Sequence, residues 1–335
     1  MQVLIVDDSR LTLMTLKSLL TTAGYDVLTA LNGQEALQVI REKGCRLVIT
    51  DWEMPIMDGI ELCRAVRADS SVSYVYLVLL TGHGKLEEMV QGLSAGADDF
   101  IAKPYQPSEV IARIRSGERI LSLETRDMAI FALAKLAESR DTDTGAHLER
   151  VQHYCRTIAQ ELATHVKYQN ALDGEFVRLV FQTSPLHDIG KVGIPDYILL
   201  KPGKLDAEEY EIMKSHTTIA GHTLDATLEK YPNASFLIMA RDIAIAHHEK
   251  FNGKGYPFGL KEEQIPLCAR IVAIADVYDA LTSKRVYKDA LMHDVAKSII
   301  CRDAGEHFDP EIVNAFLARE EEIIQIHKRF AENNA

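Results

Sequence analysis

Short apolar runs alternate with amphipathic segments over the first third of the chain. The apolar runs, rich in residues that favour strands, cover residues 2–6, 25–30, 47–50, 74–80 and 99–101. Segments with the spacing of amphipathic helices lie between them, for example at 11–23 and 33–43. Parallel strands need crossover connections, and strands that are apolar along their whole length are usually covered on both faces. The pattern therefore predicts an α/β domain built on a doubly wound, five-stranded parallel sheet.

From residue 106 the apolar positions follow helical spacing. Over 106–140 the segment is rich in charge, and Ile114, Leu121 and Met128 recur every seven residues. Three matches are too few to predict a coiled coil, so we interpret the segment as the last helix of the first domain continuing into the next. The predicted first domain, linker helix and second domain cover residues 1–121, 122–140 and 141–335.

The second domain is predicted to be all-α. Helical spacing recurs at 176–186, 236–246 and 267–281, and strand signals are nearly absent. A chain of 335 residues also exceeds the size at which one hydrophobic core stops growing, which favours two domains.

Composition and charge narrow the function classes. The formal net charge of −12 argues against a broad electrostatic grip on DNA or RNA. The five cysteines are scattered without a close pair, which is typical of a reducing compartment. No apolar run approaches the roughly 18 residues that span a bilayer, and the first residues lack the basic region of a signal peptide. We therefore expect a cytoplasmic protein without a membrane or DNA partner.

Polar side chains lie just past the ends of four of the predicted strands, at the edge where an open parallel sheet binds its ligands. They are Asp7, Asp8, Asp51, Thr81 and Lys103. Three converging carboxylates repel one another unless a cation neutralises them, which predicts a Mg²⁺ site. A carboxylate beside Mg²⁺, a lysine and a hydroxyl can accept a phosphoryl group. Each residue alone could instead cap the following helix, but the five together favour the phosphoryl site.

These segments resemble the receiver domain of two-component response regulators, which has a flavodoxin-like fold. The resemblance rests on Asp7-Asp8, on the stretch DWEMPIMDG at 51–59, on Thr81-Gly82 and on Lys103-Pro104, and it covers about the first third of the chain. It implies that a sensor histidine kinase is the partner and that Asp51 is the residue phosphorylated.

The same resemblance implies roles for the neighbours of Asp51. Asp7 and Asp8, with the backbone carbonyl of Glu53, would bind Mg²⁺. Thr81 and Lys103 would contact the phosphoryl group. The aromatic switch position of the family falls on Phe100 or Tyr105, and the sequence does not decide between them.

Histidines and aspartates in suggestive combinations mark the second domain. All but one of the 12 histidines lie after residue 146. The combinations are His147 in DTDTGAHLERV, His187-Asp188 in SPLHDIGK, His216 in MKSHTTIAGH, His247-His248 in HHEKFNGKGYP, and Asp276 with Asp279 in ADVYDAL. Metal sites in helical proteins are built from such side chains on several helices.

The adjacent pairs indicate more than one metal. Successive side chains on a helix diverge by about 100°, so His187 and Asp188 suit two neighbouring ions, with the carboxylate bridging them. His247-His248 repeats the geometry. Two such pairs predict two metals about 3.5–4 Å apart, as in phosphoester hydrolases. Imidazole and carboxylate without thiolate suit Fe, Mn, Ni or Zn.

The motifs HDIGK, HHEKFNGKGYP and ADVYDAL, followed by SKRVYK, resemble the HD-GYP phosphodiesterases over roughly residues 126–318. The resemblance implies hydrolysis of cyclic di-GMP to linear pGpG, and in some members onward to GMP. A few members act on cyclic GMP-AMP instead. The mechanism implied is metal-assisted attack of an activated water on phosphorus.

The resemblance also assigns residues. The implied metal ligands are His147, His187, Asp188, His216, His247, His248 and Asp276, with Asp188 bridging. Lys191 would contact the substrate phosphate, while Arg285 and Lys288 would hold the second phosphate and the nucleotide. Gly255, Tyr256 and Pro257 would form a lip for substrate or partner.

One position departs from the family pattern. Members with a third metal carry Glu four residues before the first ligand histidine, and here that position is Asp143. The shorter side chain favours a binuclear site. Asp279 is a candidate for a third metal or for a structural role.

Two other functions remain open. The second domain could be a cyclic-dinucleotide-responsive module that binds a protein partner through the GYP region, or a hydrolase of another nucleotide. A homodimer joined through the 106–140 helix is also compatible with the sequence. The sign of control by phosphorylation is not predicted.

Overall fold

The computed structural model describes the 335-residue chain except at residues 70, 83–85, 141–145, 170–171, 284–289 and 333–335. The chain divides into two compact units, Met1–Met128 and Ala129–Ala335. Three residues singled out from the sequence, Asp143, Arg285 and Lys288, lie outside the described residues.

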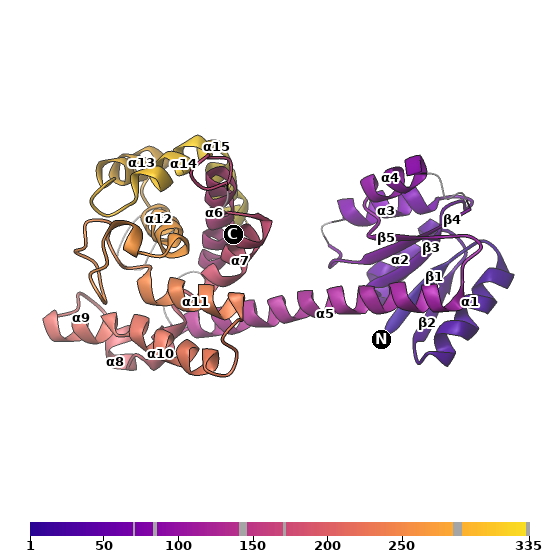
Figure 1. The fold of residues 1–335 in the computed structure, drawn as a ribbon, viewed down its shortest axis with the longest axis horizontal. Coiled ribbons are helices and arrows are strands. Elements are labelled where there is room, and N and C mark those ends of the chain that lie inside the picture. Colours follow the sequence, from indigo (N-terminus) through magenta and orange to yellow (C-terminus); the bar gives the residue numbers. More distant parts are fainter. Residues whose placement is uncertain (70, 83–85, 141–145, 170–171, 284–289, 333–335) are drawn as a thin grey trace. The chain divides into compact units, whose positions relative to one another are not determined.

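The first unit contains the predicted five-stranded parallel sheet (Figure 1). Its strands are β1 (Gln2–Val6), β2 (Asp26–Ala30), β3 (Leu47–Asp51), β4 (Tyr76–Thr81) and β5 (Asp99–Ala102). They are ordered β2-β1-β3-β4-β5, and each neighbouring pair is parallel. The order reverses direction between β1 and β3, so the carboxyl ends of these two strands form the switch-point crevice. Asp7 follows β1 there, and Asp51 ends β3.

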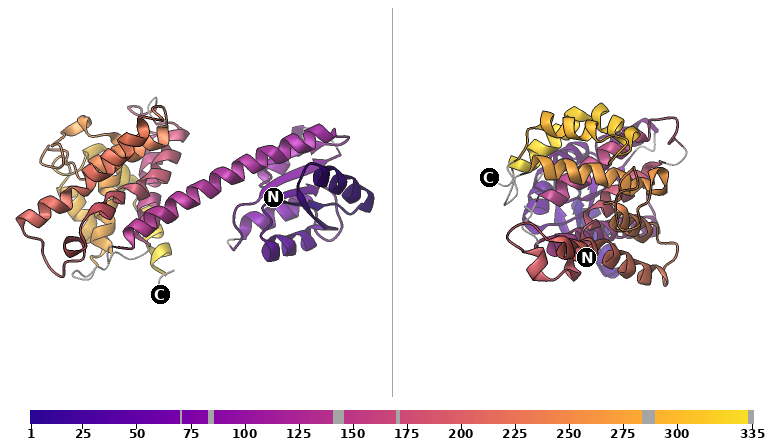
Figure 2. Two further views of the ribbon diagram at one scale, coloured as in Figure 1. Left: turned by 90° about the horizontal axis from the view of Figure 1, so that it is seen from below. Right: turned by 90° about the vertical axis from the view of Figure 1, so that its left-hand side faces the viewer.

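Helices cover both faces of this sheet (Figures 1 and 2). They are α1 (Arg10–Thr22), α2 (Gly33–Lys43), α3 (Gly59–Ala68), α4 (Leu86–Ser94) and α5 (Pro107–Glu138). One apolar cluster joins the sheet to α1 and the first part of α5, for example through Leu16 and Ile114. The other joins the opposite face to α2 and α3, for example through Ile40 and Leu62. The alternation of buried side chains along each strand produces the two clusters.

The last helix of the first unit continues into the second, as predicted. It is a single helix of 32 residues, α5. Two of the heptad positions, Ile114 and Leu121, are buried in the core of the first unit, whereas Met128 is 49% exposed. Ala134 is buried in the second unit, where Phe131 packs beside it. The heptad spacing therefore reflects packing of one helix into a core and not a coiled-coil seam.

The described part of the second unit is helical, with β-pairing limited to two isolated bridges. Its α-helices are α6 (His147–Leu162), α7 (Gly174–Thr183), α8 (Asp196–Leu199), α9 (Ala207–Lys214), α10 (His216–Leu228), α11 (Ser235–Ala246), α12 (Leu267–Thr282), α13 (His293–Arg302), α14 (Pro310–Ala318) and α15 (Glu320–Glu332). Its 3-10 helices are η1 (Ser184–Leu186), η2 (Ile189–Gly193) and η3 (Glu262–Gln264). The buried rings of Tyr154 on α6 and Tyr278 on α12 meet edge to face, with centroids 5.2 Å apart. These two helices form the centre of the core, against which α14 packs Phe316.

The prediction of one α-helix over 176–186 is wrong at its end. The α-helix α7 stops at Thr183, and residues 184–186 form the 3-10 turn η1. Pro185 lacks the N–H that the next turn of α-helix would need. This break determines where the following His187-Asp188 pair lies.

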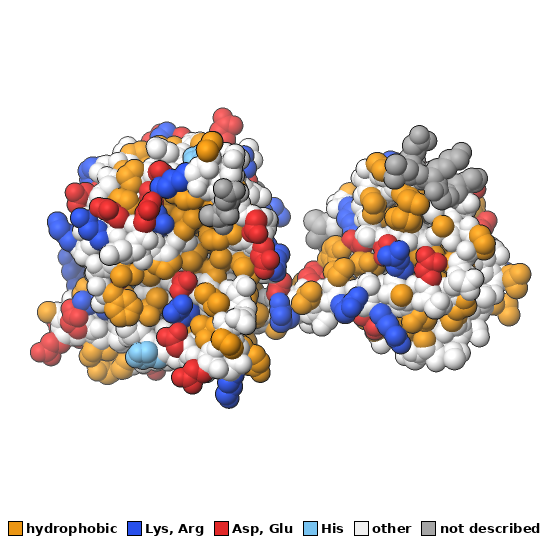
Figure 3. Space-filling model, in the orientation of Figure 1, with side chains coloured by type: hydrophobic (Ala, Val, Ile, Leu, Met, Phe, Trp, Pro, Cys, Tyr) orange, Lys and Arg blue, Asp and Glu red, His pale blue; other side chains and the backbone are white. Residues whose placement is uncertain are grey.

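Acidic and basic side chains are interspersed over the face of each unit seen in Figure 3. Among the helices that the structure describes, none has both the length and the apolar character required of a transmembrane span.

Candidate active sites

Ends of helices and turns place the predicted metal ligands of the second unit. His147 and His216 begin α6 and α10, and Asp276 lies within α12. His187 and Asp188 lie in the turn between η1 and η2. His247 and His248 follow the last residue of α11. The adjacent pairs are therefore not on helices, and the interpretation of their spacing by helical divergence is corrected: turns direct these side chains.

The predicted ligands fall into two compact groups. One consists of Asp188, His216, His247 and His248, and the other of His147, His187 and Asp276. Within each group, one ligand atom from every residue lies within 4.8 Å of those from the others. All seven residues that the resemblance assigned as ligands are thus brought together.

Hydrogen bonds set the orientation of three histidine rings. From Nδ1, His187 bonds to the carbonyl of Ser184 at 2.9 Å, His216 to that of Met213 at 2.7 Å, and His247 to that of Ile243 at 3.1 Å. A carbonyl can only accept, so Nδ1 carries the proton and Nε2 is left with its lone pair. In all three rings Nε2 is buried without a hydrogen-bond partner. Buried nitrogens of this kind fit a bound cation.

Asp188 lies between the two groups. Its Oδ1 is 3.2 Å from Nε2 of His216 and 3.7 Å from Nε2 of His247. Its Oδ2 is 3.4 Å from Nε2 of His187 and 2.9 Å from Nζ of Lys191. One oxygen faces each group, which is the arrangement required of a carboxylate that bridges two ions.

Asp279 fixes the ring of His147. Its Oδ2 lies 2.8 Å from Nδ1 of His147, and Arg150 donates to both of its oxygens, at 2.5 and 2.9 Å. Nε2 of His147 therefore faces the metal group, where Oδ1 of Asp276 is 3.7 Å away. Because both oxygens of Asp279 are bonded, this geometry favours an orienting role for Asp279 over ligation of a third metal.

Burial and charge act in opposite directions on the histidines. Burial disfavours the imidazolium form, lowering the pKa of His216 to about 4 and that of His248 well below its usual value. Burial also opposes the charged form of His187, but the charge of Asp188 outweighs it and raises the pKa to about 9. Without a metal, His216 and His248 are therefore neutral, whereas His187 carries a proton beside the anionic Asp188, and a cation bound at its Nε2 would take the place of that proton.

The pKa of Asp188 is held well below its usual range. Burial alone would raise the pKa, but the Lys191 ammonium and the His187 ring stabilise the carboxylate. Lys191 lies in η2, three residues after Asp188, so the turn that supplies the Asp188 carboxylate also supplies a cation beside it.

The predicted lip contacts the metal centre directly. The ring of Tyr256 stacks on His248, with centroids 4.8 Å apart and an interplanar angle of 28°. A Cβ on Gly255 would lie 2.3 Å from the backbone nitrogen of Lys250, so only glycine allows the loop to pass so close. Pro257 follows in the same loop, between α11 and η3.

Glu249 holds this loop, a role that the sequence reasoning missed. Its side chain is buried, with one oxygen 2.7 Å from the backbone nitrogen of Phe258 and the other 3.0 Å from that of Leu260. The signal available in the sequence was an acid directly after His247-His248 and before a glycine-rich turn.

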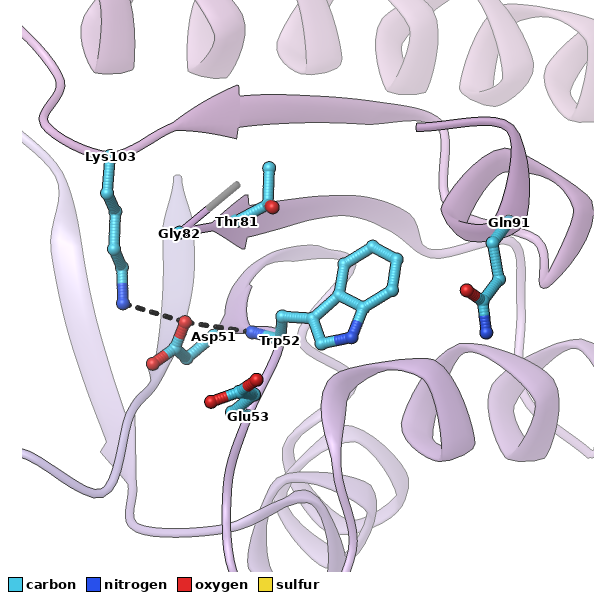
Figure 4. A pocket seen from close by; sticks show the side chains of 7 residues that line it. All are labelled: Asp51, Trp52, Glu53, Thr81, Gly82, Gln91 and Lys103. Carbon is cyan, nitrogen blue, oxygen red and sulfur yellow. Dashed lines mark hydrogen bonds and ion pairs between the residues drawn. The ribbon is translucent and has the colours of Figure 1, made fainter. Parts of the chain in front are cut away.

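Figure 4 shows four of the predicted residues, Asp51, Glu53, Thr81 and Lys103, around the crevice of the first unit. Lys103 Nζ lies 2.7 Å from Oδ1 of Asp51 and 3.8 Å from Oδ2 of Asp7. Asp7, Asp8 and Asp51 bring one carboxylate oxygen each within 4.8 Å of one another. Burial, followed by the neighbouring charge of Asp51, raises the pKa of Asp7. A cation among these oxygens would relieve that repulsion.

The remaining predicted residues border the same crevice. Thr81 ends β4, and Glu53 lies two residues beyond β3; both line the pocket around Asp51. The two aromatic candidates pack on opposite faces of the sheet, Phe100 against the α2–α3 cluster and Tyr105 against the α1–α5 cluster.

Comparison with known proteins matches both units. The response regulator receiver domain matches residues 3–115, and the HD domain, a family of metal-dependent hydrolases, matches residues 132–312. A probable cyclic di-GMP phosphodiesterase of Vibrio cholerae is 39% identical, covering 99% of this chain and 81% of that protein. The cyclic di-GMP phosphodiesterase response regulator RpfG of Xanthomonas campestris is 37% identical, covering 86% and 79%. The 3'3'-cGAMP-specific phosphodiesterase 2 of Vibrio cholerae is 39% identical, but covers 61% of this chain and 36% of that protein.

Proposed function

The chain belongs to the family of response regulators that join a receiver domain to an HD domain, and we propose that it is a cyclic di-GMP phosphodiesterase controlled by phosphorylation of Asp51. The reaction is hydrolysis of one phosphodiester bond of the cyclic dinucleotide to give linear pGpG. The phosphoryl group comes from a cognate sensor histidine kinase.

The position of Asp188 between two histidine groups carries this proposal. Its two oxygens face different groups at 3.2–3.7 Å from histidine Nε2 atoms, so a pair of ions can share it. Two divalent cations bound there would lower the pKa of an attacking water and withdraw charge from the phosphate. The Nδ1 bonds of His187, His216 and His247 orient these rings so that Nε2 is available to such ions.

Lys191 is the proposed phosphate contact. Its ammonium lies 2.9 Å from Asp188, so it is adjacent to the position that a phosphate would take beside the bridging carboxylate. There it would neutralise charge that develops on a non-bridging oxygen. By resemblance, Arg285 and Lys288 hold the second phosphate.

The donor atoms limit the choice of ions. Imidazole and carboxylate donors in the second unit suit Fe or Mn, and also Ni or Zn, in a binuclear centre. The crevice around Asp51 offers carboxylate oxygens, which suit Mg²⁺.

The position of the loop at Gly255–Pro257 supports a role in binding substrate. Tyr256 stacks on His248, so the loop borders the metal centre and can contact whatever is bound there. A loop that served only a protein partner would not need this contact. Cyclic GMP-AMP is the second candidate substrate, because a cGAMP-specific relative is 39% identical over 61% of this chain; a cyclic di-GMP phosphodiesterase of Vibrio cholerae is 50% identical over 62% of it, which favours cyclic di-GMP.

Nucleotide hydrolysis by the purified full chain tests the proposal. Protein loaded with Mn²⁺ or Fe²⁺ is incubated with cyclic di-GMP or with 3'3'-cGAMP, and the products are separated by chromatography. We expect faster loss of cyclic di-GMP and accumulation of pGpG. Onward conversion to GMP would appear as a second product.

Two histidine variants provide the contrast. His187 is a proposed ligand in the group with His147 and Asp276, and its Nε2 also lies 3.4 Å from Asp188. His187→Ala should therefore abolish hydrolysis. His222→Ala changes an exposed histidine on α10 and should leave the rate unchanged. Full activity in the His187→Ala variant contradicts the proposal. Faster hydrolysis of 3'3'-cGAMP than of cyclic di-GMP would make cyclic GMP-AMP the substrate instead.

A further inference from the structure

The carboxylate of Glu138, the last residue of α5, reaches the metal centre. Its side chain is only 10% exposed, and Oε1 lies 3.9 Å from Nε2 of His147. Neither the motifs nor the family pattern drew attention to this residue, which precedes His147 by nine positions. The family's additional carboxylate falls instead on Asp143, outside the described residues.

The distance is that of two ligands on one ion. At 3.9 Å the contact is too long for a hydrogen bond. Ligands bind such metals at about 2.0–2.2 Å, so two of them lie about 3 Å apart at a right angle and about 4 Å apart when nearly opposite. Asp276, an assigned ligand, lies 3.7 Å from the same nitrogen. Glu138 is therefore placed relative to His147 as Asp276 is.

Only one nitrogen of His147 can be the ligand atom. Nδ1 is bonded to Asp279, so the lone pair is on Nε2, the nitrogen that Glu138 and Asp276 both approach. Both carboxylates are largely buried near this nitrogen, and a divalent cation bound to it would offset their negative charge.

Contacts on both sides fix the end of α5 at this position. One turn before Glu138, Lys135 pairs with Glu149 of α6 at 3.0 Å. Two residues after it, Arg140 bonds to the carbonyl of Val192 in η2 at 2.5 Å and to Asp196 at 2.6 Å. α5 is thus anchored to α6, which begins with His147, and to η2, which directly follows Asp188. The carboxylate is thus positioned by the same framework as the ligands.

We propose that Glu138 is a ligand of the ion that Nε2 of His147 binds, so that α5 ends in the metal centre. This inference rests on the proposed binuclear centre but not on the identity of the substrate. It gives the helix that begins at Pro107, four residues after Lys103, a direct influence on metal affinity.

Metal binding to the full-length protein tests the inference. Metal-free wild type, Glu138→Gln and the control Glu149→Gln are titrated with Mn²⁺, and free Mn²⁺ is followed by electron paramagnetic resonance. Wild type should bind two ions. In Glu138→Gln one ion should bind at least about tenfold more weakly, while the ion at Asp188, His216 and His247 keeps its affinity. Glu149→Gln removes the partly exposed Lys135 pair but keeps the Arg140 anchor and every proposed ligand, so it should bind both ions as wild type does.

A cysteine variant separates ligation from folding. Glu138→Cys offers a soft thiolate, so the ratio of Zn²⁺ to Mn²⁺ affinity at one site should rise relative to wild type. A purely structural role would not shift this ratio. If Glu138→Gln binds two ions with the affinities of wild type, or if the Zn²⁺ to Mn²⁺ ratio is unchanged in Glu138→Cys, the role of Glu138 is overturned while the binuclear centre stands. Wild type that binds no second ion overturns the binuclear centre itself.

Discussion

The pairing of Arg150 with Asp279 makes a stability prediction at the residue scale. Both side chains are buried, and the guanidinium bonds to both carboxylate oxygens. Asp279→Ala leaves the cation buried without its partner, and we expect it to lower the free energy of unfolding by about 3–5 kcal/mol. Calorimetry of the metal-free full chain measures this as a lower transition temperature for the second unit.

A cap variant gives the comparison for that experiment. Asp173→Ala removes the side chain that caps α7 through the backbone N–H of Phe176, a loss of about 1 kcal/mol. If the transition temperature of Asp279→Ala is no lower than that of Asp173→Ala, the buried Arg150–Asp279 pair does not stabilise the second unit by the predicted amount.

Sequence reasoning singled out the histidines and aspartates that the structure gathers into two groups, because their types and order are distinctive, but it did not assign residues that act through neighbours. Asp279 could not be assigned, because its partner Arg150 is 129 residues away in the sequence. Glu249 binds backbone N–H groups, which leave no pattern in side-chain types. Glu138 reaches His147 only because α5 and α6 pack together.

At the scale of elements, η2 lies close to α10, and this contact places Asp188, which precedes η2, beside His216, which begins α10. A Cβ on Gly190 would lie 1.9 Å from the carbonyl oxygen of His216, and only a shift of the backbone could relieve this clash. We expect Gly190→Ala to displace the start of α10 and to weaken Mn²⁺ binding at the Asp188 group by about tenfold or more. Isothermal titration of the metal-free protein measures the affinity.

Glycine 174 provides the matched control. A Cβ at Gly174, in the first turn of α7, meets no atom within 4 Å. Gly174→Ala should therefore bind Mn²⁺ as wild type does. Equal affinities in the Gly190→Ala and Gly174→Ala variants would show that the η2–α10 contact does not set the ligand geometry.

Elements were predictable where a single periodicity governed them. The five strands fall on the predicted apolar runs, because their burial on both faces leaves a clear signal. The end of α7 was not predicted, because apolar spacing continues through 184–186 while Pro185 breaks the backbone pattern. That local break places His187 and Asp188 in a turn, where the helical argument for two metals does not apply.

At the scale of the whole molecule, phosphorylation of Asp51 should change the rate at which the second unit hydrolyses its substrate. Acetyl phosphate with Mg²⁺ should add one phosphoryl group per chain, detected by mass spectrometry, because Lys103 and the acids of the crevice surround Asp51. The hydrolysis rate is then compared before and after modification.

Two aspartate variants separate the effect of the phosphoryl group from that of charge. Asp51→Asn should take up no phosphoryl group and show no change in rate. Asp58→Asn, at the cap of α3, removes a nearby charge and should respond as wild type does. A rate that stays the same after stoichiometric phosphorylation of wild type would remove the control role.

The two-unit organisation was predictable from the change in periodicity near residue 106, but the division between the units was not. The helix α5 continues without a break from Pro107 to Glu138, across the division at Met128. Neither glycine nor proline marks that point, so the sequence carries no signal of it.

The central claim is that two ions at one bridging carboxylate hydrolyse cyclic di-GMP. The most direct test titrates the metal-free full chain with Mn²⁺ and measures the initial rate of pGpG formation at each step. We predict little rate below one equivalent, a rise that saturates near two ions per chain, and none at any loading in Asp188→Ala. A rate that saturates at one ion per chain, or pGpG formation by Asp188→Ala, would contradict the account.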